Sequence, residues 1–210
     1  AFAPLGVLAL FPNVLVCTAS FEAKTLADVL RIARSKPGSL SYASSGNGSA
    51  QHLAGALFES MAQVEMAHIP YRGGGPALND VMGGQVPLFF ANVASSLGHI
   101  QSGRLRALAV TSKLRSRVLP ELPSMDEAGL KGYEVLEWNP VLAPAGVPAP
   151  VRAKLSAALR KAMADPEVLA RVRTLGGEVF GGGEAEAAGF LRAQQALWAR
   201  VVRERRITRE

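Results

Sequence analysis

The stretch SLSYASSGNGSAQHLAGALFESMA, residues 39–62, reads as a strand, a loop of small residues and a helix. The same three parts follow in residues 66–82, MAHIPYRGGGPALNDVM. A third apolar run, VPLFFA at residues 86–91, completes the unit. Helices of this length between strands favour right-handed crossovers and parallel strand pairs. The sequence therefore predicts an α/β fold organised around residues 39–93.

The boundaries inside this unit can be predicted from local chemistry. We expect strands at residues 39–43 and 66–71. The first helix should run from about Ser49 to Ala62, with Ser49 or Gly48 as its cap. The second helix should open on Pro76, because proline lacks the N–H that would have no partner at the first helical position.

The residues before and after this unit continue the α/β pattern. Two apolar strands are expected on either side of Phe11-Pro12, where proline predicts a break and a change of direction or of lobe. Leu26, Val29, Leu30 and Ala33 share one face of a predicted helix. Further helices are predicted at residues 25–35, 95–101, 151–163, from 165 onward and 184–203, with a strand at 105–111 and an extended run at 133–143.

Composition excludes several classes of partner and site. The net charge of +6 arises largely from arginines at the C-terminal end, which have neither regularly interleaved aromatic residues nor a nucleic-acid-binding motif, so no nucleic-acid partner is predicted. These arginines are Arg192, Arg200, Arg203, Arg205, Arg206 and Arg209. The single cysteine, Cys17, lies in an apolar run and allows neither an intrachain disulfide nor a cysteine-based zinc site. No apolar run is long enough to span a bilayer.

The motifs also argue against cofactors and catalysis. The loop at residues 46–49 lacks the Gly-Lys-Ser/Thr of a P-loop, and Gln51 stands where a dinucleotide fingerprint needs its third glycine. The three histidines, His52, His68 and His99, have no metal-ligand spacing, and His68 is expected to be a satisfied core or edge residue. A serine hydrolase would need a Gly-x-Ser-x-Gly elbow, which is missing. We therefore predict no cofactor, no metal and no enzymatic activity.

The two loops of small residues indicate an anion site instead. Both follow strand ends, so the helix N-termini after them should lie at one carboxyl edge of the sheet. Unpaired N–H groups of the first helical turns would favour a negative group there. Ser44, Ser45, Asn47 and Ser49 add hydroxyl and amide donors, and Arg72 could pair with a carboxylate through two hydrogen bonds. Binding without chemistry is the simplest interpretation.

These motifs resemble those of the substrate-binding proteins of tripartite tricarboxylate transporters, the Bug/TctC family. The similarity rests on SSGNGSAQHL (44–53) and IPYRGGGPA (69–77), followed by Asn92, GRLRALAVT (103–111), LPSMDEAG (122–129) and Trp138 before APAGVP (143–148). The motifs keep a fixed order and extend over essentially the whole chain.

The resemblance implies a two-lobed periplasmic binding fold of type II, with a ligand cleft between two α/β lobes. One lobe would comprise residues 13–91, and the other residues 1–12 and 92–210. By this likeness a small carboxylated solute, such as a di- or tricarboxylate or an acidic amino acid, would bind in the cleft. The ligand-binding residues carried over are Ser44, Ser45, Asn47, Gly48, Ser49, His52, Arg72, Gly73, Gly74 and Asn92.

The resemblance also sets expectations for location, partners and completeness. It implies a periplasmic protein that delivers its solute to the permease subunits of a tripartite tricarboxylate transporter. The alternative is a sensory or scaffold protein that presents a ligand-dependent surface to a signalling partner. Family members carry a signal peptide and a further N-terminal part, so the chain is expected to be N-terminally truncated with an incomplete first lobe. Ala91 stands where many members have aspartate, which argues against a contact with a ligand amine.

Overall fold

The structure of the chain, a computed structural model, describes residues 2–208. It divides into two compact units. Unit 1 comprises the residues up to Phe11 together with Glu137–Arg200, and unit 2 comprises Pro12–Leu136 together with the residues from Val201 onward. Because these units are defined by compactness and not by closure around a ligand, the lobe boundaries at residues 13–91, 1–12 and 92–210 stay a prediction.

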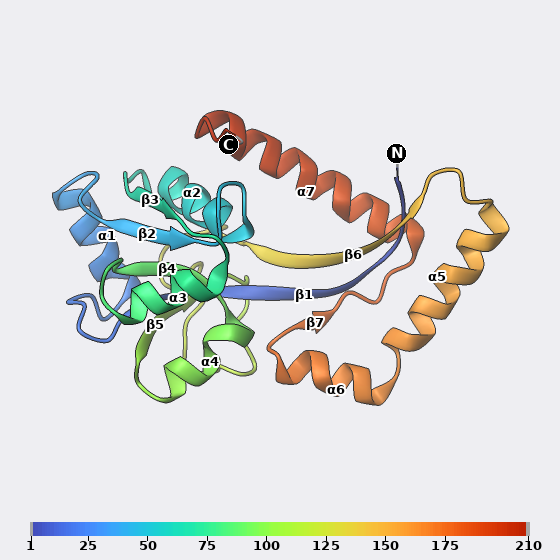
Figure 1. Cartoon of the computed structure of the whole chain (residues 1–210), viewed down its shortest axis with the longest axis horizontal. Helices are drawn as coiled ribbons and strands as arrows, with labels where there is room; N and C mark the ends of the chain where they lie inside the picture. The colour runs from blue at the N-terminus through green and yellow to red at the C-terminus, as the bar shows by residue number, and fades with distance from the viewer. Residues whose placement is uncertain (1, 209–210) are drawn as a thin grey trace. The chain divides into compact units, whose positions relative to one another are not determined.

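Helices and strands alternate through most of the chain (Figure 1). In chain order they are β1 (Phe2–Thr18), α1 (Leu26–Ser35), β2 (Ser41–Ser44), α2 (Ala50–Ala62), β3 (Ala67–Pro70), α3 (Gly74–Met82), β4 (Leu88–Asn92), α4 (Val93–Gln101), β5 (Leu105–Val110), β6 (Leu136–Pro144), α5 (Ala149–Met163), α6 (Pro166–Thr174), β7 (Glu178–Val179) and α7 (Glu184–Glu204).

The sheet of unit 2 has the strand order β3-β2-β4-β1-β5. Strand β2 runs parallel to both β3 and β4, whereas β1 is antiparallel to β4 and to β5. The parallel arrangement predicted for residues 39–91 is therefore confirmed for the three strands concerned, within a mixed sheet. The α/β class is confirmed as well.

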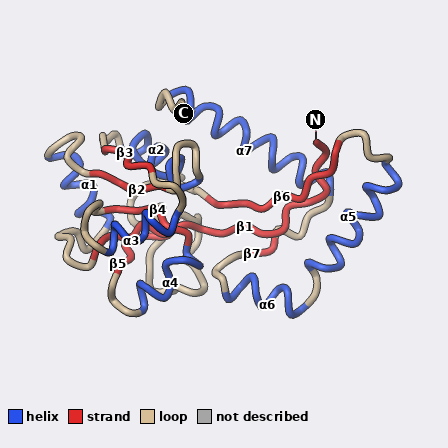
Figure 2. Tube along the Cα trace, viewed as in Figure 1, coloured by secondary structure: helices blue, strands red, loops and turns tan. Residues whose placement is uncertain are grey.

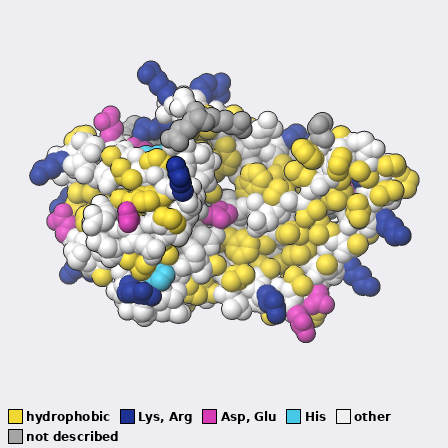
Figure 3. Space-filling model, in the orientation of Figure 1, with side chains coloured by type: hydrophobic (Ala, Val, Ile, Leu, Met, Phe, Trp, Pro, Cys, Tyr) yellow, Lys and Arg dark blue, Asp and Glu magenta, His cyan; other side chains and the backbone are white. Residues whose placement is uncertain are grey.

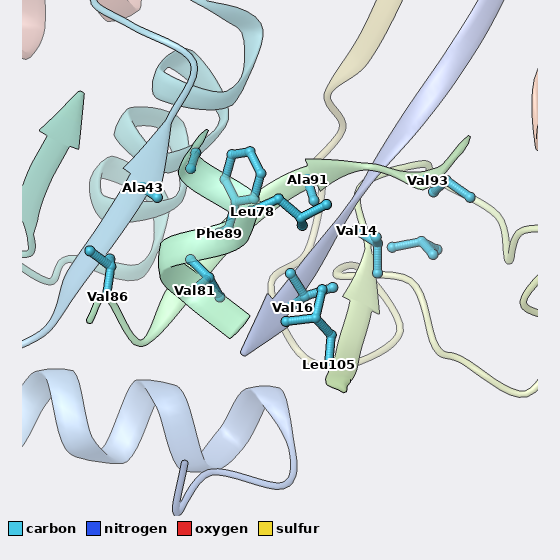
Figure 4. Close-up of a cluster of buried hydrophobic side chains, with 12 residues drawn as sticks. Val14, Val16, Ala43, Leu78, Val81, Val86, Phe89, Ala91, Val93 and Leu105 are labelled. Atoms are coloured by element: carbon cyan, nitrogen blue, oxygen red, sulfur yellow. The ribbon is translucent and has the colours of Figure 1, made fainter. Parts of the chain in front are cut away.

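The two faces of this sheet are covered by different helices. Val14, Val16 and Phe89 point to one face, where α3 packs with Ala77, Leu78 and Val81 (Figure 4). On the other face, the Phe58 ring of α2 lies 5.7 Å from the Phe90 ring. Strand alternation explains the division, because neighbouring residues of β1 and β4 point to opposite faces.

Unit 1 combines the first half of β1 with β6, β7, α5, α6 and most of α7. Strands β6 and β7 both pair with β1, the latter in antiparallel register at Ala9 and Val179. Hydrophobic side chains gather over α5 and α6 in the view of Figure 3. Several large ones are exposed in this unit, namely Phe2, Leu142, Val151, Leu155 and Leu175.

The predicted break at Phe11-Pro12 is wrong as a strand boundary. Strand β1 continues from Phe2 to Thr18 (Figure 2). What changes at the proline is the compact unit to which the strand belongs, because unit 1 ends at Phe11 and unit 2 begins at Pro12.

Most other predicted boundaries shift by one to three residues. Helix α3 begins at Gly74, so Pro76 occupies the third helical position. A backbone N–H at that position would also lack a partner within the helix, so proline costs no hydrogen bond there. Helix α4 begins at Val93 instead of Ser95, because Asn92 caps it. The short strand β7 was not predicted, since two residues carry no periodic pattern.

Local sequence chemistry explains the elements that were predicted well. Thr25 and Asp28 form a capping box at the start of α1. Cys17, which lies in an apolar run of the sequence, is buried and free, and burial raises the pKa of its thiol. Of the C-terminal arginines, Arg209 lies outside the described residues. Across residues 2–208, none of the helices combines the length and hydrophobicity needed to cross a membrane.

Candidate functional site

Three helices of unit 2 begin at one edge of its sheet. Helix α2 follows β2, α3 follows β3 and α4 follows β4, and these three strands run in the same direction. Their carboxyl ends therefore lie together, with the N-termini of α2, α3 and α4 close behind them. The N–H groups of a first helical turn have no partner within the helix, which makes this edge a favourable place for an anion.

The loop that leads into α2 is held by its own side chains. The Ser44 hydroxyl accepts a hydrogen bond from the Gly46 N–H at 3.1 Å. The Ser45 hydroxyl donates to the Gln51 side chain at 2.6 Å, and the Ser49 hydroxyl accepts from the His52 N–H at 3.2 Å as the N-cap of α2. Gly48 has a φ of 72°, a backbone conformation that favours glycine. The loop is thus ordered by contacts within residues 44–52.

His52 and His68 form a stacked pair beneath this loop. Their ring centroids lie 3.7 Å apart with an angle of 11° between the planes. His52 Nδ1 accepts a hydrogen bond from the Gly48 N–H at 3.1 Å, and His68 Nε2 is hydrogen-bonded to the Ser44 hydroxyl at 2.6 Å. His52 therefore acts on the loop backbone through Nδ1, which fixes the neutral tautomer with its proton on Nε2.

Both imidazoles are held in the neutral form. Burial lowers the pKa of His52 below its ordinary value. Burial, with a smaller contribution from the neighbouring His52, lowers the pKa of His68 to about 4. His68 lies on β3, the edge strand of the sheet order, and has a hydrogen-bond partner. The prediction of a satisfied core or edge histidine is confirmed, but its position under the loop was not predicted.

The second loop lies beside the first. The Tyr71 N–H donates to the Ser44 carbonyl at 3.0 Å, and a Cβ added to Gly46 would lie 3.4 Å from the Tyr71 carbonyl oxygen. Arg72 is exposed in this loop, Gly73 has a φ of 110°, and Gly74 is the first residue of α3. The Tyr71 hydroxyl donates to Asp80 at 2.8 Å, and burial with this carboxylate raises the pKa of Tyr71 to about 12.

Asn92 closes the edge on the other side of β2. Its side-chain oxygen accepts from the Ala94 N–H at 2.9 Å and caps α4. In the register of β1 and β4 it faces Asn13, which was not among the predicted site residues. The sequence did offer a signal, because an asparagine directly before the apolar run Val14-Leu15-Val16 is an unusual residue for a buried strand.

The structure thus joins the predicted site residues between positions 44 and 52 in one hydrogen-bonded loop. Arg72, Gly73 and Gly74 lie in the loop beside it, and Asn92 lies one strand away. Asn47 is exposed at the tip of the first loop. Within residues 2–208 no group of three or more His, Cys, Asp or Glu side chains could hold a metal ion. Which of these residues touch a ligand stays a prediction.

Two hollows lie away from this edge. One, of about 340 Å³, belongs to unit 1 and lies among β1, α5, α6 and β7, with Leu159, Met163 and Leu169 in its wall. The other, of about 520 Å³, belongs to unit 2 and is lined by Leu105, Arg106 and residues 118–122. Leu105 pairs with Thr18, at the end of β1 remote from Asn13, so this second hollow opens at the opposite edge of the sheet. Neither contains a predicted site residue.

Comparison with known proteins identifies the family. Residues 2–207 match the family model described as the tripartite tricarboxylate transporter family receptor, TctC. The chain belongs to this family. A relative from Pseudomonas sp. strain P51, the UPF0065 protein of the tcbD-tcbE intergenic region, is 40% identical over 207 residues, which are 98% of this chain and 62% of that protein.

Solved structures agree with this assignment. Rpa4515 of R. palustris with adipate has a TM-score of 0.89 and 34% identity over 99% of this chain and 69% of that one. The periplasmic binding protein BugD has a TM-score of 0.86 and 33% identity, over 100% and 71%. MatC of Rhodopseudomonas palustris with bound malate has a TM-score of 0.85 and 28% identity, over 96% and 69%.

The fold of this TctC chain is accordingly that of periplasmic binding proteins, as the sequence predicts. The chain spans less than two thirds of the length of the Pseudomonas relative. The ligands and partners of the longer proteins are therefore considered for this chain only as a proposal.

Proposed function

We propose that this chain is part of a solute-binding protein that captures a small carboxylated solute. The observation that carries the proposal is the meeting of three helix N-termini at one edge of unit 2, behind loops rich in serine, asparagine and glycine. Helix N-termini and hydroxyl donors favour a carboxylate without any metal or general base. Relatives of this chain have been solved with adipate and with malate, both of which carry carboxylates.

In this proposal the two loops have different tasks. The first loop, residues 44–49, supplies backbone N–H groups and the Ser49 hydroxyl to one carboxylate, while the Ser45 hydroxyl stays on Gln51. His52 holds that loop in place through the Gly48 N–H at 3.1 Å and contributes its own Nε2–H on the other side of the ring. Arg72 is exposed beside the first loop and has the planar guanidinium that pairs with a carboxylate through two hydrogen bonds.

Membership in the family supports a periplasmic location and delivery to permease subunits of a tripartite tricarboxylate transporter. No enzymatic step is part of the proposal, because the family receptors and the solved relatives are solute-binding proteins. The histidine pair serves the loop conformation and needs no catalytic role.

Isothermal titration of the chain with adipate, malate, citrate and glutamate tests the proposal. The fully amidated form of each acid serves as the control, since it keeps the length of the solute and removes every carboxylate charge. We expect one or more of the acids to bind and the amides to fail. Absence of binding by every acid in the panel, to a chain that is folded by circular dichroism, would contradict the proposal.

A matched pair of cap variants locates the site. Ser49→Ala removes the N-cap of α2 at the proposed site, and Thr25→Ala removes the N-cap of α1, which is not part of it. Each substitution should cost about 1 kcal/mol of stability. Only Ser49→Ala should weaken solute binding, by roughly tenfold for one lost hydrogen bond to a charged group. Equal affinities of the two variants would place the solute elsewhere.

A further inference from the structure

Asn13 is a buried amide without a hydrogen-bond partner. Its side chain is 0% exposed, and neither Oδ1 nor Nδ2 has a partner in the structure. A side-chain amide can donate two hydrogen bonds and accept two, and a buried polar group left unpaired is costly. Most buried polar atoms in proteins are satisfied, so an asparagine with both ends unsatisfied points to a group that binds there.

The backbone of Asn13 is fixed in place. Its N–H donates to the Thr111 hydroxyl at 2.7 Å, and its carbonyl accepts from the Thr111 N–H at 2.8 Å. A shift of the backbone that would bring the Asn13 side chain to another partner would break these two hydrogen bonds. Val14 and Val16 point to the face covered by α3, so Asn13 points to the opposite face, which it shares with Phe90 and α2.

Asn13 also lies at the carboxyl edge of the parallel strands. It pairs with Asn92, the last residue of β4 and the cap of α4. Continuing the register of β2 with β4 puts Ser44 level with Phe90, so Asn13 lies two residues further toward the edge, at the level of the loop that follows Ser44. Two strand spacings, about 10 Å, separate β1 from β2. A small dicarboxylate with a hydrogen bond at each end covers this span.

The chemistry of an amide narrows the class of solute. A plain carboxylate offers acceptors only, which would satisfy Nδ2 and leave Oδ1 without a donor. A solute with a hydroxyl group beside its carboxylate offers both, and so satisfies both ends of the Asn13 amide. We propose that Asn13 is a specificity-determining residue of the solute site and selects hydroxycarboxylates over dicarboxylates that lack the hydroxyl. This inference rests on the proposed function.

The competing explanation is an ordered water molecule with a purely structural role. A buried water needs two to four polar partners, and the Asn13 amide together with the edge backbone could supply them. The two explanations differ in one respect: a structural water affects the stability of the fold, whereas a solute contact affects the ratio of affinities for two solutes that differ only in the hydroxyl.

Titration with malate and succinate, which differ in that hydroxyl, separates them. The unaltered chain should bind malate at least tenfold more tightly than succinate, because bound succinate would leave the Asn13 Oδ1 without a hydrogen-bond donor. Asn13→Leu keeps the size of the side chain and removes both polar ends. It should weaken malate binding at least tenfold and change succinate binding much less, so that the preference disappears.

Two further variants make the result unambiguous. Asn13→Asp keeps the shape and replaces the donor with a negative oxygen, so both acids should bind more weakly, while malate stays preferred because its hydroxyl can still donate to a side-chain oxygen. Thr18→Val alters a buried polar side chain at the other end of β1 and should leave both affinities unchanged. Circular dichroism confirms that each variant is folded before titration.

The possible failures can be told apart. Binding of malate and succinate to the unaltered chain with equal affinity, or an unchanged preference in Asn13→Leu, would overturn the inference and leave the proposed function standing. A thermal midpoint altered in Asn13→Leu without a change in either affinity would assign the amide to a structural water. Absence of binding by every acid of the wider panel would overturn the inference together with the proposed function.

Discussion

Lowering the pH from 7 to 5 should destabilise unit 2 through the stacked pair His52 and His68. Both rings are neutral in the folded chain, because burial lowers the pKa of each below its ordinary value of 6.5. In the unfolded chain both would titrate near pH 6.5. Below that pH the unfolded chain therefore binds protons that the folded chain does not, and folding stability falls.

The size of the effect follows from His68. The fall of its pKa from 6.5 to about 4 corresponds to about 2 kcal/mol between pH 7 and pH 5, and solvent screening of a half-buried ring reduces this to about 1–2 kcal/mol. The thermal midpoint should accordingly drop by about 2–8 °C for a chain of this size. The loss should level off below about pH 4, where folded His68 also takes up a proton.

Urea denaturation at pH 7, 6 and 5 measures this difference, and His68→Phe is the matched variant. Phenylalanine keeps a ring against His52 but cannot titrate. The variant is less stable at pH 7, because the Ser44 hydroxyl loses its partner at 2.6 Å. Its loss of stability between pH 7 and pH 5 should be at most half that of the unaltered chain. Equal losses in the two proteins would refute the assignment of the effect to the stacked pair.

Three further predictions concern packing and charge. Gly55→Ala should destabilise the chain by about 1–3 kcal/mol in urea denaturation, because the new Cβ would clash with the Tyr42 ring; unchanged stability would mean that the ring can move. Thr25→Ala should cost about 1 kcal/mol without changing solute affinity, which titration checks. Arg205→Ala leaves the buried Glu59 carboxylate without its 2.7 Å partner and should cost about 1–3 kcal/mol at pH 7, with a smaller loss at pH 5 as the carboxyl takes up a proton.

Much of unit 2 could be predicted from the sequence because its signals are local. Ser49 caps α2, Gly48 provides the positive φ, and glycines lead into α3. The hydrophobic runs around them give the strands and the inward faces of the helices. These features depend on spacings of a few residues, which the sequence displays directly.

The contacts between distant residues could not be predicted in this way. His52 and His68 stack only because β3 lies beside β2, and no spacing in the sequence links the two residues. Asn13 pairs with Asn92 across β1 and β4, a register set by the whole sheet. The continuous strand β1 also depends on its partners, since Pro12 alone favours a break.

The hydrogen bonds inside the loop of residues 44–52 also affect the speed of binding. Ser45 is held by Gln51, and Gly48 by His52, before any solute arrives. A loop that is already ordered loses little conformational entropy on binding. Association from this side of the site should then be limited by diffusion, without a slow step in which the loop reorganises. Differences between solutes should therefore lie in how fast each one leaves.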